Sequence, residues 1–319
     1  MTTGGDGMRV GTRINRQVAP GEMRGLARQA DQSGLDELWV VEDCFYTGGI
    51  ANAATVLAVT ESITVGIGVL PTVARNPAIA AMELATLAQL HPGRLTVAFG
   101  HGVPAWMRQI GAYPKSPLAA LEETLDVIKR LLSGERVSVD GKHVRLDEVE
   151  LEYKPSVVPP LLAGVRGPKS LAVSGRKADG TILAEPAAPE YIRETREITG
   201  NAITTYNWFA LDEDHERARE RVRGRVAAAL GVNSAPHVRP MPFGEELLAI
   251  MESGEDVASQ LRPEWIDQLS VSGPLEHCAE RVRQLHEAGS ESVVLLPLPG
   301  ESAAESIAAA GEVKARLAR

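Results

Sequence analysis

The chain has 319 residues, of which 44 % are hydrophobic, 24 % charged and 4 % aromatic, and its formal net charge at pH 7 is −9. This composition is typical of a soluble globular protein and excludes fibrous, disordered and membrane-spanning classes, since no apolar run approaches the roughly 18 residues of a membrane helix. The negative charge argues against a nucleic-acid partner, because affinity for a phosphate backbone comes from clustered lysines and arginines.

The N-terminal segment, residues 1–7, is small and polar and lacks the basic and apolar regions of a signal peptide. We expect it to form a flexible tail ahead of a single domain over residues 8–319. Cys44 and Cys278 are far apart in the chain and form neither a disulfide framework nor a Cys-x-x-Cys pair. These features predict a cytoplasmic protein, and no His-Glu-x-x-His or comparable cluster indicates a metal site.

Strand-like and helix-like segments alternate along the whole chain. The strand-like runs are Met8 to Ile14, Leu38 to Val41, Ile63 to Leu70, Leu95 to Phe99, Leu161 to Val165, Thr181 to Ala184, Ile203 to Ala210 and Val293 to Leu296. Such alternation indicates parallel strands joined by crossover helices. Eight repeats favour an α/β fold of the (β/α)8 or TIM-barrel type over its competitor, an open doubly wound sheet.

Two insertions interrupt this rhythm. Residues 134–160 have prolines and glycines near both ends and are expected to form a short hairpin excursion. Residues 231–263 are rich in proline and then helical, and they form the longest insertion. In a barrel, long insertions often cover the mouth of the active site, so we expect that position for residues 231–263.

Two consecutive helices are predicted to be apolar nearly all round. They span residues 50–59 and 78–90 and are rich in Ala, Ile, Leu and Val. A monomeric barrel would leave one side of each helix in water, so the pattern favours a homodimer or a larger homo-oligomer. The alternative is that the long insertion covers them.

In a barrel, functional groups lie at the carboxyl ends of the strands. The second predicted strand ends in Glu42-Asp43-Cys44-Phe45-Tyr46, a segment dense in polar and aromatic side chains. An acidic pair in this position indicates a functional site, and the alternative is a helix cap or an ion pair with an arginine of the barrel. The lone Cys44 is expected to be a small apolar group rather than a nucleophile.

Glycines mark the third and fourth predicted strands. Gly66 and Gly68 interrupt the third strand, which predicts a bulge or close contact with a flat ligand, the alternative being tight packing inside the barrel. The fourth strand ends at Gly100-His101-Gly102, so His101 lies at the mouth. There it has either a structural role or a role as proton donor or ligand contact.

The fifth predicted strand leads into a helix through the segment Gly164-Val165-Arg166-Gly167-Pro168-Lys169-Ser170. Free backbone N–H groups at a helix start, with Arg166 and Lys169 beside them, suit an anionic phosphate. The chain contains neither a P-loop nor a convincing Gly-x-Gly-x-x-Gly turn. A nucleotide bound in the Rossmann manner is therefore disfavoured.

An ordered set of motifs runs through most of the chain. It comprises Trp39-Val-Val-Glu-Asp43, Gly66-Ile-Gly-Val69 with Arg75-Asn-Pro77, His91-Pro-Gly-Arg94, Gly100-His-Gly102, and Gly164-Val-Arg-Gly-Pro-Lys-Ser170 with Ala178-Asp-Gly180. This set resembles the bacterial-luciferase-like superfamily, and within it the deazaflavin-dependent branch related to methylenetetrahydromethanopterin reductase. The resemblance implies a (β/α)8 barrel with insertions, usually dimeric or larger, that binds FMN or the 8-hydroxy-5-deazaflavin coenzyme F-420 (F420) at the strand ends.

The resemblance also implies a site, position by position. Asp43 would contact the deazaflavin ring, and a non-prolyl cis peptide bond at Gly68-Val69 would form a bulge behind it. The implied cofactor-binding residues are Asp43, Gly68, Val69, Gly100, His101, Gly102, Gly164, Val165, Arg166, Gly167, Pro168 and Lys169, with the phosphate-bearing tail near residues 164–169. The candidate catalytic residues are Asp43, which would orient the ring, and the possible proton donors His101, Tyr46 and Glu185.

One departure from the family pattern bears on the activity. Cys44 and Val103 stand where the sugar-phosphate dehydrogenases of the family have His and Glu, so the resemblance does not extend to glucose 6-phosphate oxidation by that pair. The leading prediction is an oxidoreductase that transfers a hydride between F420 and a small organic substrate. The alternatives are an FMN-dependent luciferase-like monooxygenase and, because of Val103, a non-catalytic barrel that binds a cofactor or another ligand.

Overall fold

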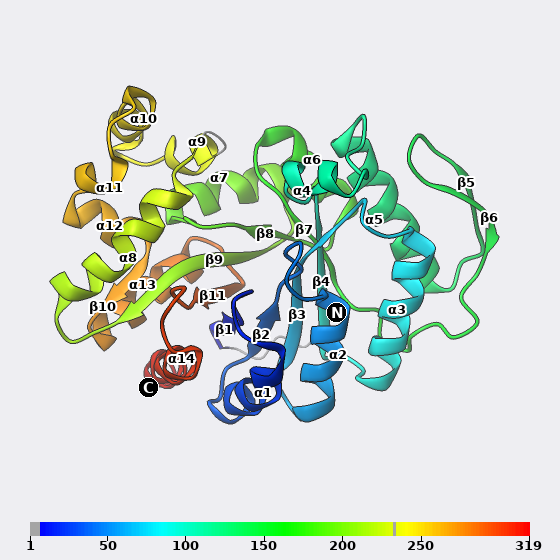
Figure 1. The fold of residues 1–319 in the computed structure, drawn as a ribbon, viewed down its shortest axis with the longest axis horizontal. Coiled ribbons are helices and arrows are strands. Elements are labelled where there is room, and N and C mark those ends of the chain that lie inside the picture. Colours follow the sequence, from blue (N-terminus) through cyan, green and yellow to red (C-terminus); the bar gives the residue numbers. More distant parts are fainter. Residues whose placement is uncertain (1–6, 232–233) are drawn as a thin grey trace.

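The computed structural model describes residues 7–231 and 234–319, within which eight parallel strands close into a barrel (Figure 1). These strands are β1 (Arg9–Arg13), β2 (Glu37–Val40), β3 (Thr64–Pro71), β4 (Leu95–Gly100), β7 (Leu161–Gly164), β8 (Gly180–Leu183), β9 (Ala202–Leu211) and β11 (Ser292–Leu296). Each coincides with one of the predicted strands, so the predicted (β/α)8 fold is confirmed. The predicted tail, except for Gly7, lies outside the described residues.

The barrel closes because its first and last strands pair. β1 lies between β2 and β11, with Val10 opposite Val293. β9 connects β8 to β11 on the far side of the ring, with Thr205 opposite Leu183. Each barrel strand therefore lies between two neighbours under a layer of helices, which explains why most strand residues are buried.

Helices surround the barrel, each between two consecutive barrel strands. They are α1 (Met23–Gln32), α2 (Gly49–Val59), α3 (Pro77–Leu90), α5 (Pro117–Ser133), α6 (Pro168–Lys177), α7 (Pro189–Thr199), α13 (Leu275–Glu287) and, after β11, α14 (Ala303–Leu317). A short helix, α4 (Pro104–Gln109), and a 3-10 turn, η1 (Pro20–Glu22), supplement them. Among the described residues, no helix is both long enough and apolar enough to cross a bilayer.

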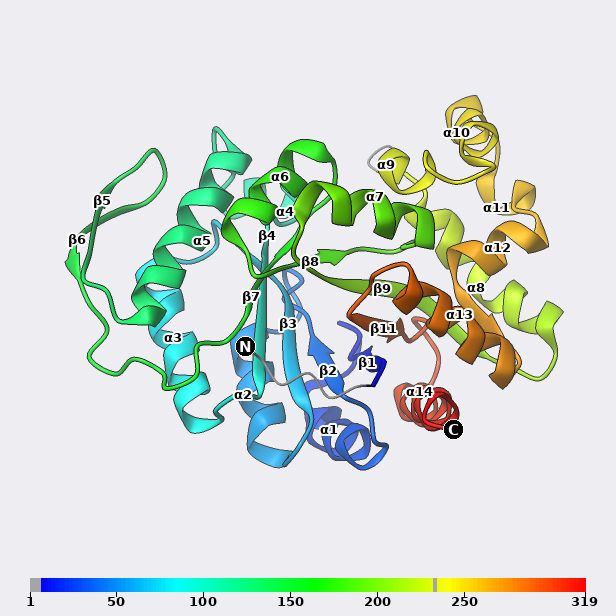
Figure 2. The ribbon, with the colours of Figure 1, turned by 180° about the vertical axis from the view of Figure 1, so that it is seen from behind.

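Two excursions leave the barrel in regions that overlap the predicted insertions. A hairpin of β5 (Val137–Asp140) and β6 (Arg145–Val149) follows α5. The crossover from β9 to β11 holds α8 (His215–Ala229), α9 (Ala235–Val238), α10 (Gly244–Ser253), α11 (Val257–Gln260), α12 (Pro263–Leu269) and β10 (Val271–Gly273). Figures 1 and 2 show the hairpin at one end of the molecule and α10 with α11 at the other. Residues 232–233 of the second predicted insertion lie outside the described residues.

Aromatic rings occupy the inside of the barrel. Trp39 and Tyr206 belong to one buried cluster, and their rings meet edge to face with 5.8 Å between centroids. Gly66, opposite Trp39 on the neighbouring strand, makes room for the indole, because a Cβ atom there would lie 2.2 Å from the Trp39 ring. Of the roles left open for Gly66, the structure therefore shows tight packing inside the barrel.

Candidate active site

A cavity of about 780 Å³, here named the mouth cavity, opens at the carboxyl ends of the barrel strands. Of the predicted site residues, it is lined by Asp43, Gly68, Val69, His101, Gly102, Gly164, Val165, Arg166, Gly167 and Glu185. Gly100, Pro168, Lys169 and Tyr46 do not line it. Pro236 of α9 also contributes to the wall, so the long insertion reaches the mouth as expected.

The strand β3 bulges where the mouth cavity begins. Its pairing with β4 changes register between Gly68 and Leu70, and the Gly68-Val69 peptide bond is cis, as the resemblance implied. A Cβ atom at Gly68 would lie 2.1 Å from Tyr206 Oη, and one at Gly164 would lie 2.3 Å from Val69 Cγ1. Glycine at these two positions therefore permits the bulge and the close approach of its neighbours.

Glu42 and Asp43, the two acidic residues after β2, have different roles. Glu42 Oε2 accepts hydrogen bonds from the Gly49 backbone N–H at 2.8 Å and from Arg75 Nη2 at 2.7 Å. Glu42 thus fastens the start of α2 to the loop after β3, the structural role considered for this pair. Asp43 lines the mouth cavity, and its Oδ2 accepts from Arg16 Nη1 at 3.1 Å. The Asp43 side chain is about a third exposed, which leaves it accessible to a ligand.

His101 connects the end of β4 to α6. Its Nε2 lies 3.1 Å from Ser170 Oγ, and its Nδ1 is buried without a hydrogen-bond partner among the described residues. Burial lowers the pKa of the His101 imidazole below its ordinary value. Burial therefore favours the neutral form of the imidazole, and the His101 side chain lines the mouth cavity.

The N-terminus of α6 lies at the rim of the mouth cavity. Gly167 precedes the helix with φ of 79°, a left-handed conformation that favours glycine. Arg166 and Gly167 both line the cavity. A guanidinium group and the free N–H groups of a first helical turn thus lie at one edge of the site, an arrangement that suits an anionic group.

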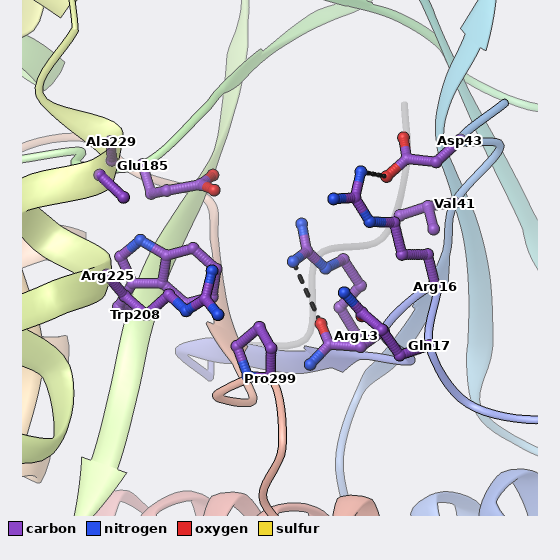
Figure 3. A pocket seen from close by; sticks show the side chains of 12 residues that line it. Arg13, Arg16, Gln17, Val41, Asp43, Glu185, Trp208, Arg225, Ala229 and Pro299 are labelled. Atoms are coloured by element: carbon purple, nitrogen blue, oxygen red, sulfur yellow. Dashed lines mark hydrogen bonds and ion pairs between the residues drawn. The ribbon is translucent and has the colours of Figure 1, made fainter. Parts of the chain in front are cut away.

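A smaller cavity of about 270 Å³, here named the arginine pocket, adjoins the mouth cavity and shares Arg13, Asp43 and Glu185 with it. Figure 3 shows this pocket, with Arg16 and Asp43 on one wall and Arg225 and Glu185 on the facing wall. The two cavities form adjoining compartments of one site.

Glu185 occupies the junction of the two cavities. It follows β8 and lines both of them. None of the ion pairs formed by the described residues involves its carboxylate, which points into the open space in Figure 3. Tyr46, by contrast, lines neither cavity and is 53 % exposed, with Arg16 above its ring at 5.1 Å from the centroid. Of the predicted proton donors, the structure thus brings Glu185 and His101 to the site but not Tyr46.

One group outside the site has the composition of a metal centre. The ligand atoms of His215, Asp267 and His277 lie within 4.8 Å of one another. Arg219, however, donates to both oxygens of Asp267, at 2.9 Å and 2.6 Å. This ion pair already compensates the carboxylate charge that a cation would need, so we assign no metal to the group.

The sequence model of the luciferase-like monooxygenase family matches residues 6–292, most of the chain. The chain belongs to this family. The predicted resemblance is therefore confirmed.

This luciferase-like protein is similar to two relatives in sequence and to one solved structure in fold. It is 25 % identical over 289 residues to a 5,10-methylenetetrahydromethanopterin reductase from Methanolobus tindarius, covering 84 % of this chain and 87 % of the relative. It is 28 % identical over 326 residues to an F420-dependent glucose-6-phosphate dehydrogenase from Nakamurella multipartita, covering 93 % and 92 %. Its fold matches the coenzyme F420 dependent tetrahydromethanopterin reductase from Methanopyrus kandleri with a TM-score of 0.79 at 19 % identity, over 96 % of this chain and 97 % of the other.

The luciferase-like site includes residues that the sequence analysis did not identify. Arg13 is the last residue of β1 and Arg16 lies shortly after it, so their place at a strand end was a signal that could have revealed them. Arg225 lies on α8 and Trp208 lies within β9, and both line the arginine pocket. No local motif marks these two residues, because only the folded chain brings the β9 to β11 crossover to the mouth.

Proposed function

We propose that this luciferase-like protein is an oxidoreductase that transfers a hydride between coenzyme F420 and a small organic substrate. The observation that carries the proposal is the mouth cavity, backed by the Gly68-Val69 bulge at the carboxyl ends of the strands. The relatives support the choice of cofactor, since the sugar-phosphate dehydrogenase and the solved reductase are both named as F420-dependent.

The residues of the mouth cavity fit a deazaflavin. Its volume of about 780 Å³ falls within the range of roughly 300–1,000 Å³ that is usual for cofactor sites. Gly68 and Val69 supply a backbone wall for a flat ring, and the imidazole of His101 supplies a polar group beside it. Arg166, with the first turn of α6, supplies positive potential for a phosphate-bearing tail.

In this reaction the protein binds and orients the reactants and exchanges a proton with the substrate. When bound, the cofactor supplies the carbon that gives or takes the hydride. Asp43, held by Arg16 at 3.1 Å, orients the ring. Glu185 exchanges the proton, since it lies between the two compartments with a carboxylate that no cation of the described residues pairs with. As a substrate carbon gains the hydride, its attached heteroatom takes the Glu185 proton, and in oxidation both steps reverse.

Parallel titrations of the apo-protein with F420 and with FMN, followed by cofactor fluorescence, test this proposal. We expect F420 to bind with a micromolar or lower Kd and FMN to bind much more weakly. Unsaturated carbonyls, imines and alcohols are then the substrates to screen. Preference for FMN would support a monooxygenase, the activity in the family's name. Binding of neither cofactor would contradict both activities and favour a non-catalytic barrel.

Replacing Asp43 by alanine is expected to weaken F420 binding or turnover by about tenfold or more, because the variant loses a charge-assisted contact to the ring. The Kd from fluorescence titration and steady-state kinetics measure the effect. The matched control is Asp140→Ala in the β5–β6 hairpin, where the carboxylate is 89 % exposed and far from the site in sequence and fold. Equal behaviour of the two variants would remove Asp43 from the site.

We also propose that two copies of the chain associate through α2 and α3, the helices over the predicted segments 50–59 and 78–90. In the single chain, Ile79, Met82 and Leu90 of α3 are 48 %, 51 % and 67 % exposed. Large apolar side chains grouped on one helix usually mark a contact with another protein. A second copy would remove this surface from water by a symmetric contact.

The Ile79→Glu, Met82→Glu double variant is expected to be a monomer, whereas the parent chain is a dimer or larger. Charged side chains in the centre of an apolar contact cannot be desolvated without a large cost. Sedimentation equilibrium of both proteins measures the difference. A parent chain that sediments as a monomer would contradict this contact.

A further inference from the structure

The arginine pocket contains more hydrogen-bond donors than the protein itself satisfies. Arg13 Nη2 donates to Asn15 Oδ1 at 3.2 Å, but Arg13 Nε is buried without a partner among the described residues. Trp208, which is only 7 % exposed, has a buried Nε1 that also lacks a partner there. Buried donors without acceptors are uncommon in native proteins, because each has lost its hydrogen bonds to water. Arg13 lines the pocket, so an acceptor on a ligand there would engage its guanidinium group.

The charges of the pocket favour the same kind of ligand. Arg16 is paired with Asp43 at 3.1 Å. Neither Arg13 nor Arg225 forms an ion pair within the described part of the chain, and both line the pocket beside the single unpaired carboxylate of Glu185. The five charged groups therefore leave one positive charge in excess, in a chain whose overall charge is negative.

The position of Arg13 is fixed before a ligand arrives. Its guanidinium lies over the ring of Tyr206, 5.6 Å from the centroid, and over that of Trp208 at 5.9 Å. Contacts of this kind orient a guanidinium and reduce the conformational freedom that binding would otherwise remove. Figure 3 shows the side chain extending into the space between the two walls of the pocket.

We infer that the arginine pocket binds an anionic group of the substrate, a carboxylate or a phosphate, through Arg13 and Arg225. This inference rests on the proposed function, since it specifies the substrate class of that site. Arginine is suited to both anions, because its planar fork matches their paired oxygens. Glu185 and Asp43 line both compartments, so an anion held here directs the rest of the substrate past Glu185 toward the mouth cavity.

Calorimetric titration of the full chain with inorganic phosphate and with malonate tests the inference without a cofactor. We expect at least one of the two anions to bind the parent chain, and the stronger one identifies the preferred group. Arg225→Gln should weaken binding about fivefold and Arg13→Gln about tenfold or more, since each variant loses a charge-assisted contact. Because Arg225 is exposed on α8, its replacement leaves the core unchanged and carries the test if Arg13→Gln fails to fold.

Two further variants assign the site of the bound anion. Arg145→Gln, which removes a hairpin arginine whose side chain is 78 % exposed, should bind like the parent chain. Arg166→Gln removes the arginine at the proposed site of the cofactor's phosphate-bearing tail, so it reports any anion that binds at α6 instead. Loss of binding in Arg166→Gln with none in Arg225→Gln would place the anion at α6 and overturn the inference, as would failure of both anions to bind the parent chain. If anion binding survives but F420 does not bind, the proposed function fails while the pocket stands.

Discussion

Replacing Gly66 by alanine is expected to lower the free energy of unfolding by about 3 kcal/mol, at the upper end of what overpacking costs. The added Cβ would lie 2.2 Å from Trp39 Cδ2 and 2.3 Å from Cε3. The indole cannot move aside easily, because it is 1 % exposed and its Nε1 donates to Glu37 Oε2 at 2.7 Å. Urea unfolding followed by circular dichroism measures the loss.

Gly25→Ala is the matched control for Gly66→Ala. Gly25 is an exposed residue inside α1, and a Cβ atom there meets nothing within 4 Å. The same chemical change should stabilise the protein by about 0.5–1 kcal/mol, because alanine is the better helix former. Similar unfolding curves for the two variants would show that Trp39 does not fix the interior of the barrel.

Replacing Glu185 by glutamine is expected to reduce kcat about a hundredfold or more, the usual contribution of a positioned acid or base. The amide keeps the size of the side chain but can neither release nor take up the proton. Because Glu185 lies at the junction of the cavities rather than beneath the cofactor, the Kd for F420 should change little. Turnover with a substrate found by screening, together with the fluorescence Kd, separates the two effects.

Glu152→Gln, an exposed residue after β6, provides the control and should retain full turnover. The kcat of His101→Gln is the second comparison, because the imidazole of His101 is another group in the mouth cavity that can carry a proton. A larger loss of kcat in His101→Gln than in Glu185→Gln would transfer the proton role to the histidine. Unchanged kcat in Glu185→Gln would exclude the carboxylate from the reaction.

The fold was predictable because each barrel strand is locally marked. Most of the eight strands contain a short apolar run bounded by polar residues, glycine or proline, and the family resemblance implied even the bulge at Gly68-Val69. The register between strands was not predictable from one sequence. Gly66 could therefore be assigned to a bulge, a ligand contact or packing, until the pairing placed it opposite Trp39.

The candidate site was only partly predictable for a similar reason. Asp43 and Glu42 are neighbours in sequence with the same chemistry, and both line the mouth cavity. Their roles diverge because Arg75 and Gly49 hold Glu42, whereas Asp43 also lines the arginine pocket. Lys169 satisfied the sequence criterion for an anion site but lies outside the cavity lining. A local motif shows which side chains lie near a strand end. Their hydrogen-bond and ion-pair partners come from loops that are distant in the sequence.

The division of the site between two compartments has a consequence for how this protein could diversify. The mouth cavity is built mainly by strand ends and the bulge, and packing inside the barrel fixes their positions. The outer wall of the arginine pocket comes from α8, in the long crossover that the barrel strands do not need for their pairing. Substitutions in that crossover can alter which molecule is accepted while the cofactor surface stays intact, so descendants of this chain can exchange reactants without rebuilding their catalytic apparatus.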